Sequence, residues 1–157
     1  MKIALILTGK TTDKHIATGM ETYSKRISRY MGFELITLPD LQNTRNMPVE
    51  EQKIKEGKKI IQSIGKDDYV VLLDEYGTQF RTIEFAEWLE KIFISQNKRM
   101  LFIIGGPWGF SEEVHAACNM KLSLSKMTFS HQLVRLLFVE QLYRAFTVIK
   151  GEPYHHE

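Results

Sequence analysis

Three short runs of the chain are apolar at nearly every position, and they constrain the fold more than any other feature. The runs cover residues 3–7, 69–73 and 100–104. Strands with one face in water alternate apolar and polar residues, whereas strands covered on both faces are apolar throughout, as in parallel sheets. Segments with helical periodicity separate the runs, and this alternation is typical of α/β proteins. The sequence therefore predicts an α/β fold with a mostly parallel sheet of five or six strands.

The other elements follow from periodicity and from residues that begin or end helices. Asp13 is placed to cap a helix that Gly32 ends, and Pro48 suits the first turn of a helix with Ile54 and Ile60 facing inward. The sequence Asp-Glu-Tyr-Gly at 74–77 is expected to end the central strand. The expected strands are 2–7, 33–38, 69–73, 100–104 and 120–124, and the expected helices start near residues 13, 48, 82, 111 and 132.

Length and composition limit the class of protein. At 157 residues, with 43% apolar and 25% charged side chains, the chain suits one domain spanning 1–157. No apolar run approaches the roughly 20 residues that cross a bilayer, and residues 3–7 are too few for a signal-peptide core. The single cysteine, Cys118, excludes an internal disulfide and a multi-cysteine metal site. We expect a cytoplasmic protein with no membrane association and no metal.

The net charge of +2 permits an RNA partner without arguing for one. Lysines and arginines gather on the first two expected helices. Such clusters are most simply solvated helix faces.

Two loops follow strands in the last third of the chain. In Ile104-Gly-Gly-Pro-Trp-Gly109 the glycines allow backbone amides to approach a ligand, at the strand end where α/β proteins bind small molecules. The motif matches neither a Walker loop nor a dinucleotide fingerprint, and a simple tight turn is an equal alternative. Residues 123–130, Ser-Leu-Ser-Lys-Met-Thr-Phe-Ser, can present polar groups to a heterocycle, or can simply end a strand and cap a helix from Ser130.

The last expected helix, 132–149, is apolar on two sides. A broad face runs from Phe138 to Ile149, and Leu133, Leu137 and Val148 lie on the opposite side. A helix that is apolar on two sides needs two partners. The sheet supplies one, and a second copy of the chain in a homodimer is the plausible other.

Polar residues near the C-terminus carry competing interpretations. Arg135 falls within the apolar face, where it can snorkel, pair with a carboxylate or bind an anion. Glu140 and Arg144 are four residues apart and suit a helix ion pair. The tail contains Tyr154 and His155, which either fray or fold into a site where an aromatic ring stacks on an unpaired base.

These motifs together resemble the RlmH family. The resemblance is carried by Ile104-Gly-Gly-Pro-x-Gly, by Leu-Ser-x-Met-Thr-Phe-x-His131, by Val134-Arg-x-x-x-x-Glu-Gln-x-Tyr-Arg-Ala145 and by the ending Pro-Tyr-His155. Members are small SPOUT methyltransferases that act on a pseudouridine in bacterial 23S rRNA. The similarity covers the whole chain, with the specific motifs in its C-terminal half.

The resemblance implies a C-terminal trefoil knot, an exception to unknotted topology. It also implies a homodimer, a cofactor and two sets of site residues. The S-adenosylmethionine pocket is implied at Leu73, Gly105, Gly106, Ser125, Lys126, Met127, Thr128, Phe129 and Ser130. The residues near the target base are implied to be Tyr154, His155, Arg135, Glu140 and Arg144.

The implied reaction is methyl transfer to N3 of the pseudouridine. The enzyme must align N3 with the methyl group and assist loss of the N3 proton. His155 could be the base, and Arg135 or Arg144 could stabilise the anion. Because the chain is small and carries little charge, we expect RNA recognition to come from the surface of the protein dimer and from the shape of the assembled 70S ribosome. The alternative is a non-catalytic ribosome-associated or nucleotide-binding α/β module.

Overall fold

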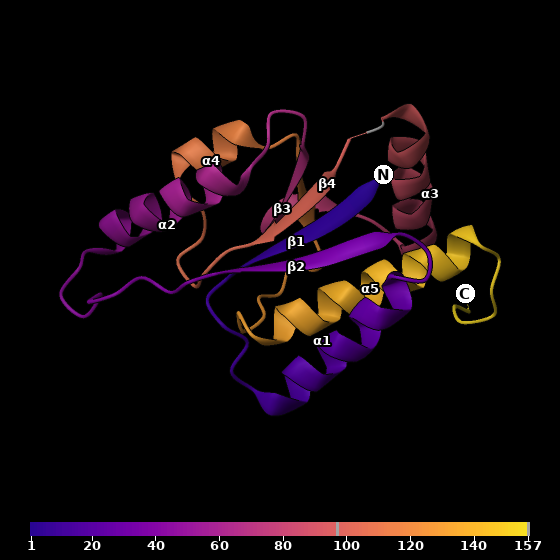
Figure 1. The fold of residues 1–157 in the computed structure, drawn as a ribbon, viewed down its shortest axis with the longest axis horizontal. Coiled ribbons are helices and arrows are strands. Elements are labelled where there is room, and N and C mark those ends of the chain that lie inside the picture. The colour runs from indigo at the N-terminus through magenta and orange to yellow at the C-terminus, as the bar shows by residue number, and fades with distance from the viewer. Residues whose placement is uncertain (97, 157) are drawn as a thin grey trace.

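The computed structural model describes residues 1–96 and 98–156, so two positions of the predicted domain over 1–157 lie outside the described residues. Across the described part, five strands alternate with five helices (Figure 1). In chain order the elements are β1 (Lys2–Thr8), α1 (Lys14–Ile27), β2 (Gly32–Leu38), α2 (Val49–Ser63), β3 (Tyr69–Gln79), α3 (Thr82–Ser95), β4 (Met100–Ile104), α4 (Glu112–Ala117), β5 (Met120–Ser123) and α5 (Leu133–Ile149).

The described strands form one five-stranded sheet in the order β2-β1-β4-β3-β5. Every pairing is parallel, as the fully apolar runs predicted. All strands therefore end at the same edge of the sheet, and the loops that follow β3, β4 and β5 meet there. The predicted α/β class with a parallel sheet is confirmed, while the trefoil knot stays a prediction.

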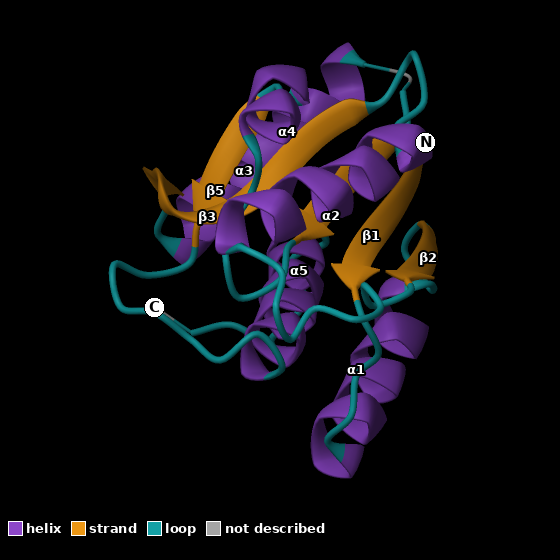
Figure 2. Cartoon of the chain, turned by 90° about the vertical axis from the view of Figure 1, so that its left-hand side faces the viewer, coloured by secondary structure: helices purple, strands orange, loops and turns teal. Residues whose placement is uncertain are grey.

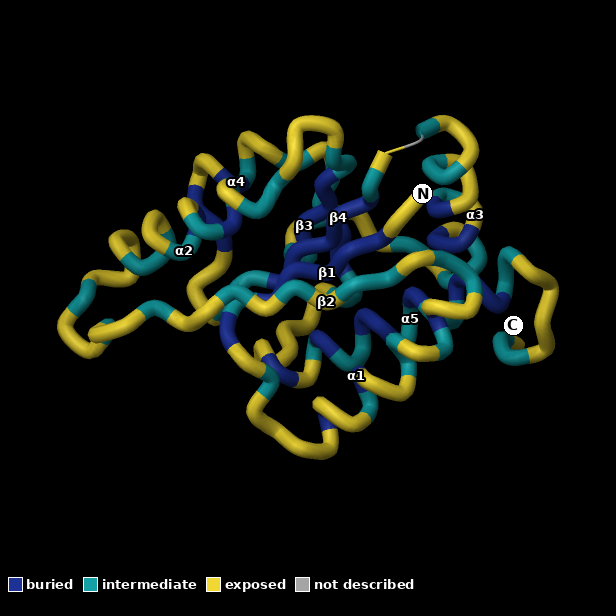
Figure 3. The backbone as a smooth tube through the Cα atoms, in the orientation of Figure 1, coloured by how far each residue is buried: buried dark blue, intermediate teal, exposed yellow. Residues whose placement is uncertain are grey.

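Helices cover both faces of the sheet. Figure 1 shows α2 and α4 on one side and α1 and α5 on the other. Residues of β1 alternate between the two layers: Ile3 and Leu5 pack toward α1, α3 and α5, whereas Ala4 and Ile6 pack toward α2 and α4. β4 is buried along its whole length and β1 along all but its end residues, while the outer helix surfaces are exposed (Figure 3). This double cover explains why the strands lack polar alternation.

The prediction that residues 74–77 end the central strand is wrong. β3 continues to Gln79, and its pairing with β5 shifts register between Leu73 and Thr78. The shift accommodates the extra residues as an outward bulge. Gly77 makes it possible, because a Cβ there would lie 2.6 Å from the backbone of Lys121.

Two further expectations for the helices need correction. α1 ends at Ile27, before the predicted stop, and Gly32 is instead the first residue of β2. Ile54 is 44% exposed, whereas Ile60 is buried as predicted. α2 therefore contacts the sheet layer mainly through its C-terminal half. Among the described residues, no helix is both long enough and apolar enough to cross a membrane.

α5 is buried along the predicted broad face, where Phe138, Leu142 and Phe146 pack into the core of the same chain. Its N-terminus is capped by Ser130, whose Oγ accepts from Leu133 N at 3.1 Å. On the other side Leu133 is 40% exposed. The second apolar side of this helix therefore remains open within one chain.

Candidate functional site

A cavity of about 710 Å³ lies at the carboxyl-terminal edge of the sheet. Its walls come from the bulge of β3 and from the loops that follow β4 and β5, which meet at this edge because the strands are parallel. The volume falls within the range typical of small-molecule sites, roughly 300–1,000 Å³. Eight of the nine predicted cofactor residues line it: Leu73, Gly105, Gly106, Ser125, Met127, Thr128, Phe129 and Ser130. The ninth, Lys126, is exposed beside it.

The glycine loop is held from α2. Glu56 Oε1 accepts the backbone N–H of Gly106 at 3.0 Å, and one turn earlier Gln52 Oε1 accepts the indole N–H of Trp108 at 3.2 Å. A Cβ on Gly106 would lie 2.7 Å from the other Glu56 oxygen, so glycine permits this close approach. Burial raises the pKa of the Glu56 carboxyl, and the nearby Asp40 raises it further. α2 therefore fixes one wall of the cavity.

The serine loop forms the opposite wall. Ser123 Oγ donates to Ser125 O at 2.9 Å, and Ser125 Oγ accepts from Met127 N at 3.0 Å. These bonds shape the turn, yet residues 126–131 remain exposed. The loop thus combines a fixed entry with backbone and hydroxyl groups open toward the cavity. The prediction that Ser130 caps the following helix is confirmed by its bond to Leu133 N, whereas binding of a heterocycle by this segment stays a prediction.

His115 was not singled out by sequence reasoning, but it borders the cavity from α4. Its Nδ1 is buried and has no hydrogen-bond partner within the described part of the chain. The ring packs edge-on against Phe110, with ring centroids 5.9 Å apart. A buried polar atom without a partner is costly, so a bound ligand or water is the natural partner. Only its position in the fold marks this residue, since nothing in the sequence around it does.

The predicted tail residues form a second cluster. Tyr154 stacks on Tyr143, with ring centroids 4.7 Å apart, and its hydroxyl donates to Glu140 Oε1 at 3.1 Å. Arg144 Nε donates to the same oxygen at 3.1 Å, and the Arg144 guanidinium lies 4.9 Å from the Tyr154 ring centroid. Nη1 of Arg144 is 3.4 Å from Nδ1 of His155. The tail is therefore folded onto α5.

Neighbouring groups in this cluster shift the pKa values of Arg144 and Tyr154. The hydrogen bond to Glu140 raises the pKa of the Arg144 guanidinium. Burial raises the pKa of Tyr154, with Tyr23 and the Glu140 charge adding to the effect. Because a guanidinium nitrogen can only donate, its contact with His155 uses Nδ1 as an acceptor. Tyr154 thus stays a neutral hydroxyl, and the cluster places a cation, a carboxylate and an imidazole together.

The cavity and the tail cluster lie toward opposite ends of the sheet. Val134 borders the cavity at the start of α5, whereas Arg144 lies ten residues later, or about 15 Å along the helix axis. The tail also contacts the end of α1, where the Tyr30 hydroxyl donates to Glu152 Oε2 at 2.6 Å. Figure 1 shows the C-terminal segment beyond the far end of α5. One chain therefore does not bring the two predicted sets of site residues together.

Arg135 belongs to neither set. It is 0% exposed, and its guanidinium donates to the backbone oxygens of Thr8, Gly9 and His131. Gln132 holds the same loop, because its Oε1 accepts from Thr12 N at 2.8 Å. Burial lowers the pKa of Arg135. Arg135 is thus a clamp between the β1–α1 loop and α5, and its donors are used within the chain, whereas the resemblance implied that they are turned toward a target base.

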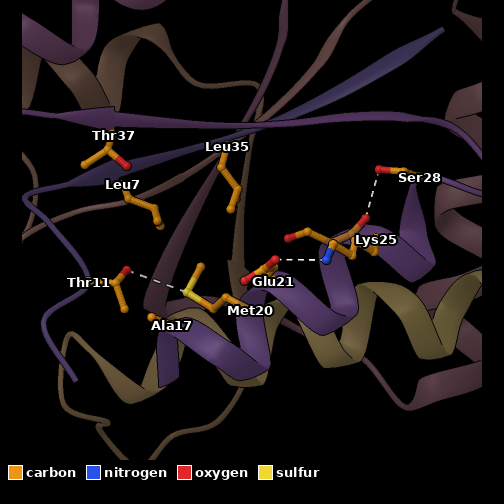
Figure 4. Close-up of a pocket in the computed structure, with 10 residues that line it drawn as sticks. Leu7, Thr11, Ala17, Met20, Glu21, Lys25, Ser28, Leu35 and Thr37 are labelled. Atoms are coloured by element: carbon orange, nitrogen blue, oxygen red, sulfur yellow. Dashed lines mark hydrogen bonds and ion pairs between the residues drawn. The ribbon is translucent and has the colours of Figure 1, made fainter. Parts of the chain in front are cut away.

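A second hollow, of about 460 Å³, lies between α1 and the edge strand β2 (Figure 4). Its floor is aliphatic, with Leu7, Met20 and Leu35. Its two charged side chains, Glu21 and Lys25, form an ion pair with each other at 2.9 Å. The hollow lacks the converging loops of the larger cavity, so we take the larger cavity as the candidate site. Within the described residues, no group of three or more histidine, cysteine or acidic side chains is placed to hold a metal.

Figure 2 views the molecule from the side where loops gather at the ends of the strands. Two solved structures share this architecture. A tRNA (m1G37) methyltransferase from Aquifex aeolicus matches with a TM-score of 0.56 at 17% identity, over 100% of this chain and 76% of that one. A probable methylase family protein from Haemophilus influenzae Rd KW20 matches with a TM-score of 0.52 at 13% identity, over 99% and 70%. At these identities the likeness concerns the fold.

Sequence comparison is more specific. A ribosomal RNA large subunit methyltransferase H from Bacteroides fragilis is 49% identical over 157 residues, covering 100% of both chains. The protein of the same name from Christiangramia forsetii is 51% identical over 156 residues, covering 99% of both. The family model described as predicted SPOUT methyltransferase matches residues 1–155. The resemblance stated from the motifs is confirmed, and the chain belongs to the SPOUT methyltransferase family.

Proposed function

We propose that this protein is an S-adenosylmethionine-dependent methyltransferase that methylates N3 of a pseudouridine in 23S rRNA. The observation that carries the proposal is the cavity at the strand ends, which collects eight of the nine residues expected to hold the cofactor. Similarity over nearly the full length, at 49–51% identity, to proteins named ribosomal RNA large subunit methyltransferase H supports the substrate class.

The cavity walls suit the proposed cofactor. Leu73 and Phe129 offer apolar contacts for an adenosyl group, and the hydroxyls of Ser125, Thr128 and Ser130 lie in the same loop as Phe129. The backbone groups of the two loops can bind a polar heterocycle. When bound, the cofactor supplies a methyl group on a sulfonium, so this chain need not create an electrophile. The task of this chain is to hold the cofactor, to orient its methyl group and to shield it from water.

The tail cluster offers the groups that N3 requires. N3 of a pseudouridine carries a proton that must leave as the methyl group arrives. His155 is the proposed acceptor of this proton, and Arg144 is the proposed cation beside the developing imide anion. Glu140 fixes the orientation of Arg144 and Tyr154 by hydrogen bonds to both. Tyr154 is the proposed stacking partner of the target base.

We propose that two copies of the chain complete the site in trans. In one chain the tail cluster and the cavity lie toward opposite ends of α5. An apolar groove of about 340 Å³ joins the cavity to the open side of α5, with Leu122, Leu124 and Phe129 lining both. A second copy seated on this groove would also cover Leu137, which predicts a homodimer with a twofold axis. The tail of one chain would then reach the cavity of the other.

The substrate is proposed to be the assembled 70S ribosome in the cytoplasm. The chain as a whole carries a net charge of only +2, and we propose that it acts as one SPOUT domain over 1–157. Affinity for free RNA depends strongly on phosphate neutralisation, which this chain offers sparsely. Recognition of a formed ribosomal surface is the economical solution.

The function is tested by tritiated methyl transfer to 70S ribosomes that lack the modification, followed by localisation of the label in 23S rRNA. Thermal melts with S-adenosylhomocysteine should show a rise in melting temperature, since a ligand that binds the native state stabilises it. A shift with ATP but none with S-adenosylhomocysteine would instead favour the nucleotide-binding alternative.

A further inference from the structure

A tryptophan stands exposed at the mouth of the site cavity. Trp108 is 52% exposed, although it belongs to the glycine loop and lines the cavity. Its indole N–H donates to Gln52 of α2 at 3.2 Å. This bond holds the ring in one orientation while much of its surface stays open. An anchored, exposed aromatic ring is preorganised to receive a flat ligand.

A second aromatic residue stands at the same mouth. Tyr76 is 89% exposed and lies in the bulge of β3. Its backbone N–H donates to Asp74 Oδ1 at 2.8 Å, which fixes the turn that carries it. The bulge of β3 and the glycine loop, which are distant in sequence, therefore each present an exposed aromatic ring to one opening. The fold places these rings beside the cavity and outside the core.

A cation accompanies the rings. Lys53 follows Gln52 on α2 and lines the same cavity. Its nearest acidic neighbour, Glu50, is 3.9 Å away, at the limit of an ion pair, and Glu50 is itself largely exposed. The combination of aromatic faces with a lysine is the chemistry that binds single-stranded nucleic acid, because bases stack on the rings and phosphates meet the cation.

We infer that Trp108, anchored by Gln52, is a stacking subsite for an unpaired RNA base that neighbours the target nucleotide. Tyr76 forms a second wall of this subsite and Lys53 contacts the adjacent phosphate. The inference rests on the proposed function and extends it, because it assigns substrate positioning to the glycine-loop wall and leaves the chemistry to the tail cluster. Trp108 is a specificity residue in this scheme and takes no part in proton transfer.

The test compares Trp108→Ala and Trp108→Phe with wild-type protein, using 70S ribosomes that lack the modification. Loss of one stacked base should raise KM for ribosomes on the order of tenfold, with kcat and the Kd for S-adenosylhomocysteine within about twofold of wild type. Trp108→Phe should restore most of the loss, and Gln52→Ala should show a smaller rise because it frees the ring. Ile94→Ala is the matched control, since Ile94 is 82% exposed on α3, away from the cavity.

A fluorescence measurement separates RNA from cofactor. The chain has two tryptophans, so Trp88→Phe leaves Trp108 as the sole indole emitter. Saturating S-adenosylhomocysteine should change its emission little. Strong quenching, with weakened S-adenosylhomocysteine binding in Trp108→Ala, would overturn the inference in favour of a cofactor contact. A shift of Trp108→Ala toward monomer in sedimentation would overturn it in favour of a contact between copies.

Two further outcomes are decisive. If wild-type protein methylates ribosomes and Trp108→Ala does so with unchanged KM, the inference fails while the proposed function stands. If wild-type protein transfers no methyl group to ribosomes, the proposed function fails and takes the inference with it.

Discussion

The regions at the two ends of α5 differ in how exposed their polar groups are and in what those groups bond to. At its start, the cavity loops are exposed and held from outside, with Met127 77% exposed and Gly106 tied to Glu56 of α2. At its other end, the charged and hydroxyl groups are satisfied by one another, because Glu140 accepts hydrogen bonds from both Arg144 and Tyr154. The first region is open to a ligand, and the second is already organised without one.

This difference suggests a division of labour. In loops that must admit a cofactor, the polar groups have to stay free of hydrogen bonds to one another. Such loops are therefore held in position by contacts with neighbouring helices. Groups that act on the substrate must already be oriented when it arrives, so they are locked by mutual contacts. Because both regions are well formed but lie apart in one chain, the proposed function requires a second copy of the chain to bring them together.

Breaking that assembly should have the largest effect. In Leu133→Glu, a charge enters the open apolar side of α5, where burial without a partner is costly. We expect monomers in sedimentation, a near-native melting temperature and methyl transfer at background level. Leu35→Glu is the matched control, because Leu35 is also 40% exposed but lies on β2. A dimeric, active Leu133→Glu protein would place the contact between copies elsewhere.

Removing the imidazole at the tail should have the next largest effect. His155→Ala should lower kcat for ribosomes on the order of 100-fold or more, the usual scale for a positioned acid–base group. Binding of S-adenosylhomocysteine, measured by calorimetry, should stay within about twofold because the cavity draws on other loops. His156→Ala serves as the control, since its side chain is exposed. Full activity of His155→Ala would direct the search for the base to Glu140 or His131.

Two arginines on α5 separate stability from activity. Arg135→Met leaves the buried carbonyls of Thr8 and Gly9 without their donor, so the free energy of unfolding should fall by about 2–4 kcal/mol in urea titrations. Arg144→Met should cost less stability, because that side chain is partly exposed, but should lower methyl transfer strongly. The reverse pattern would mean that the two roles have been exchanged.

Replacing Glu56 should have the smallest effect, a change in thermal stability that depends on pH. Its pKa is raised in the folded protein, so its contribution to stability is greatest below the ordinary carboxyl pKa and is lost as pH rises through the folded value. Glu56→Gln keeps an acceptor for Gly106 without the buried charge. Its melting temperature at pH 7 should exceed that of wild type, and the difference should shrink as pH falls toward the ordinary carboxyl pKa. Glu51→Gln, at an exposed position on the same helix, is the matched control.

Much of the fold could be predicted because it depends on local pattern. The apolar runs at 69–73 and 100–104 predict strands covered on both faces. Ser111 predicts the start of a helix, and in the structure its Oγ accepts from Val114 N at 3.4 Å. The bulge after Leu73 could not be read, because its glycine is explained only by the backbone of Lys121 across the sheet. Such long-range contacts leave no mark in local periodicity.

The candidate site was predictable in part for the same reason. The cofactor loops follow strands and carry recognisable motifs, so their convergence follows from parallel topology. His115 was missed because an isolated histidine on a short helix has no local signature. The role of Arg135 was left open because the sequence shows a charge on an apolar face but not the carbonyls of Thr8 and Gly9 that receive its hydrogen bonds.

The central claim is that the tail of one chain serves the cavity of another, and mixing two inactive variants tests it most directly. His155→Ala lacks the tail group, and Thr128→Trp blocks the cavity; each should form inactive homodimers. After co-refolding, mixed dimers hold one intact site, so total methyl transfer should return to about one quarter of wild type. If the mixture stays as inactive as its parents although sedimentation and mass spectrometry show mixed dimers, the tail acts within its own chain and the account is wrong.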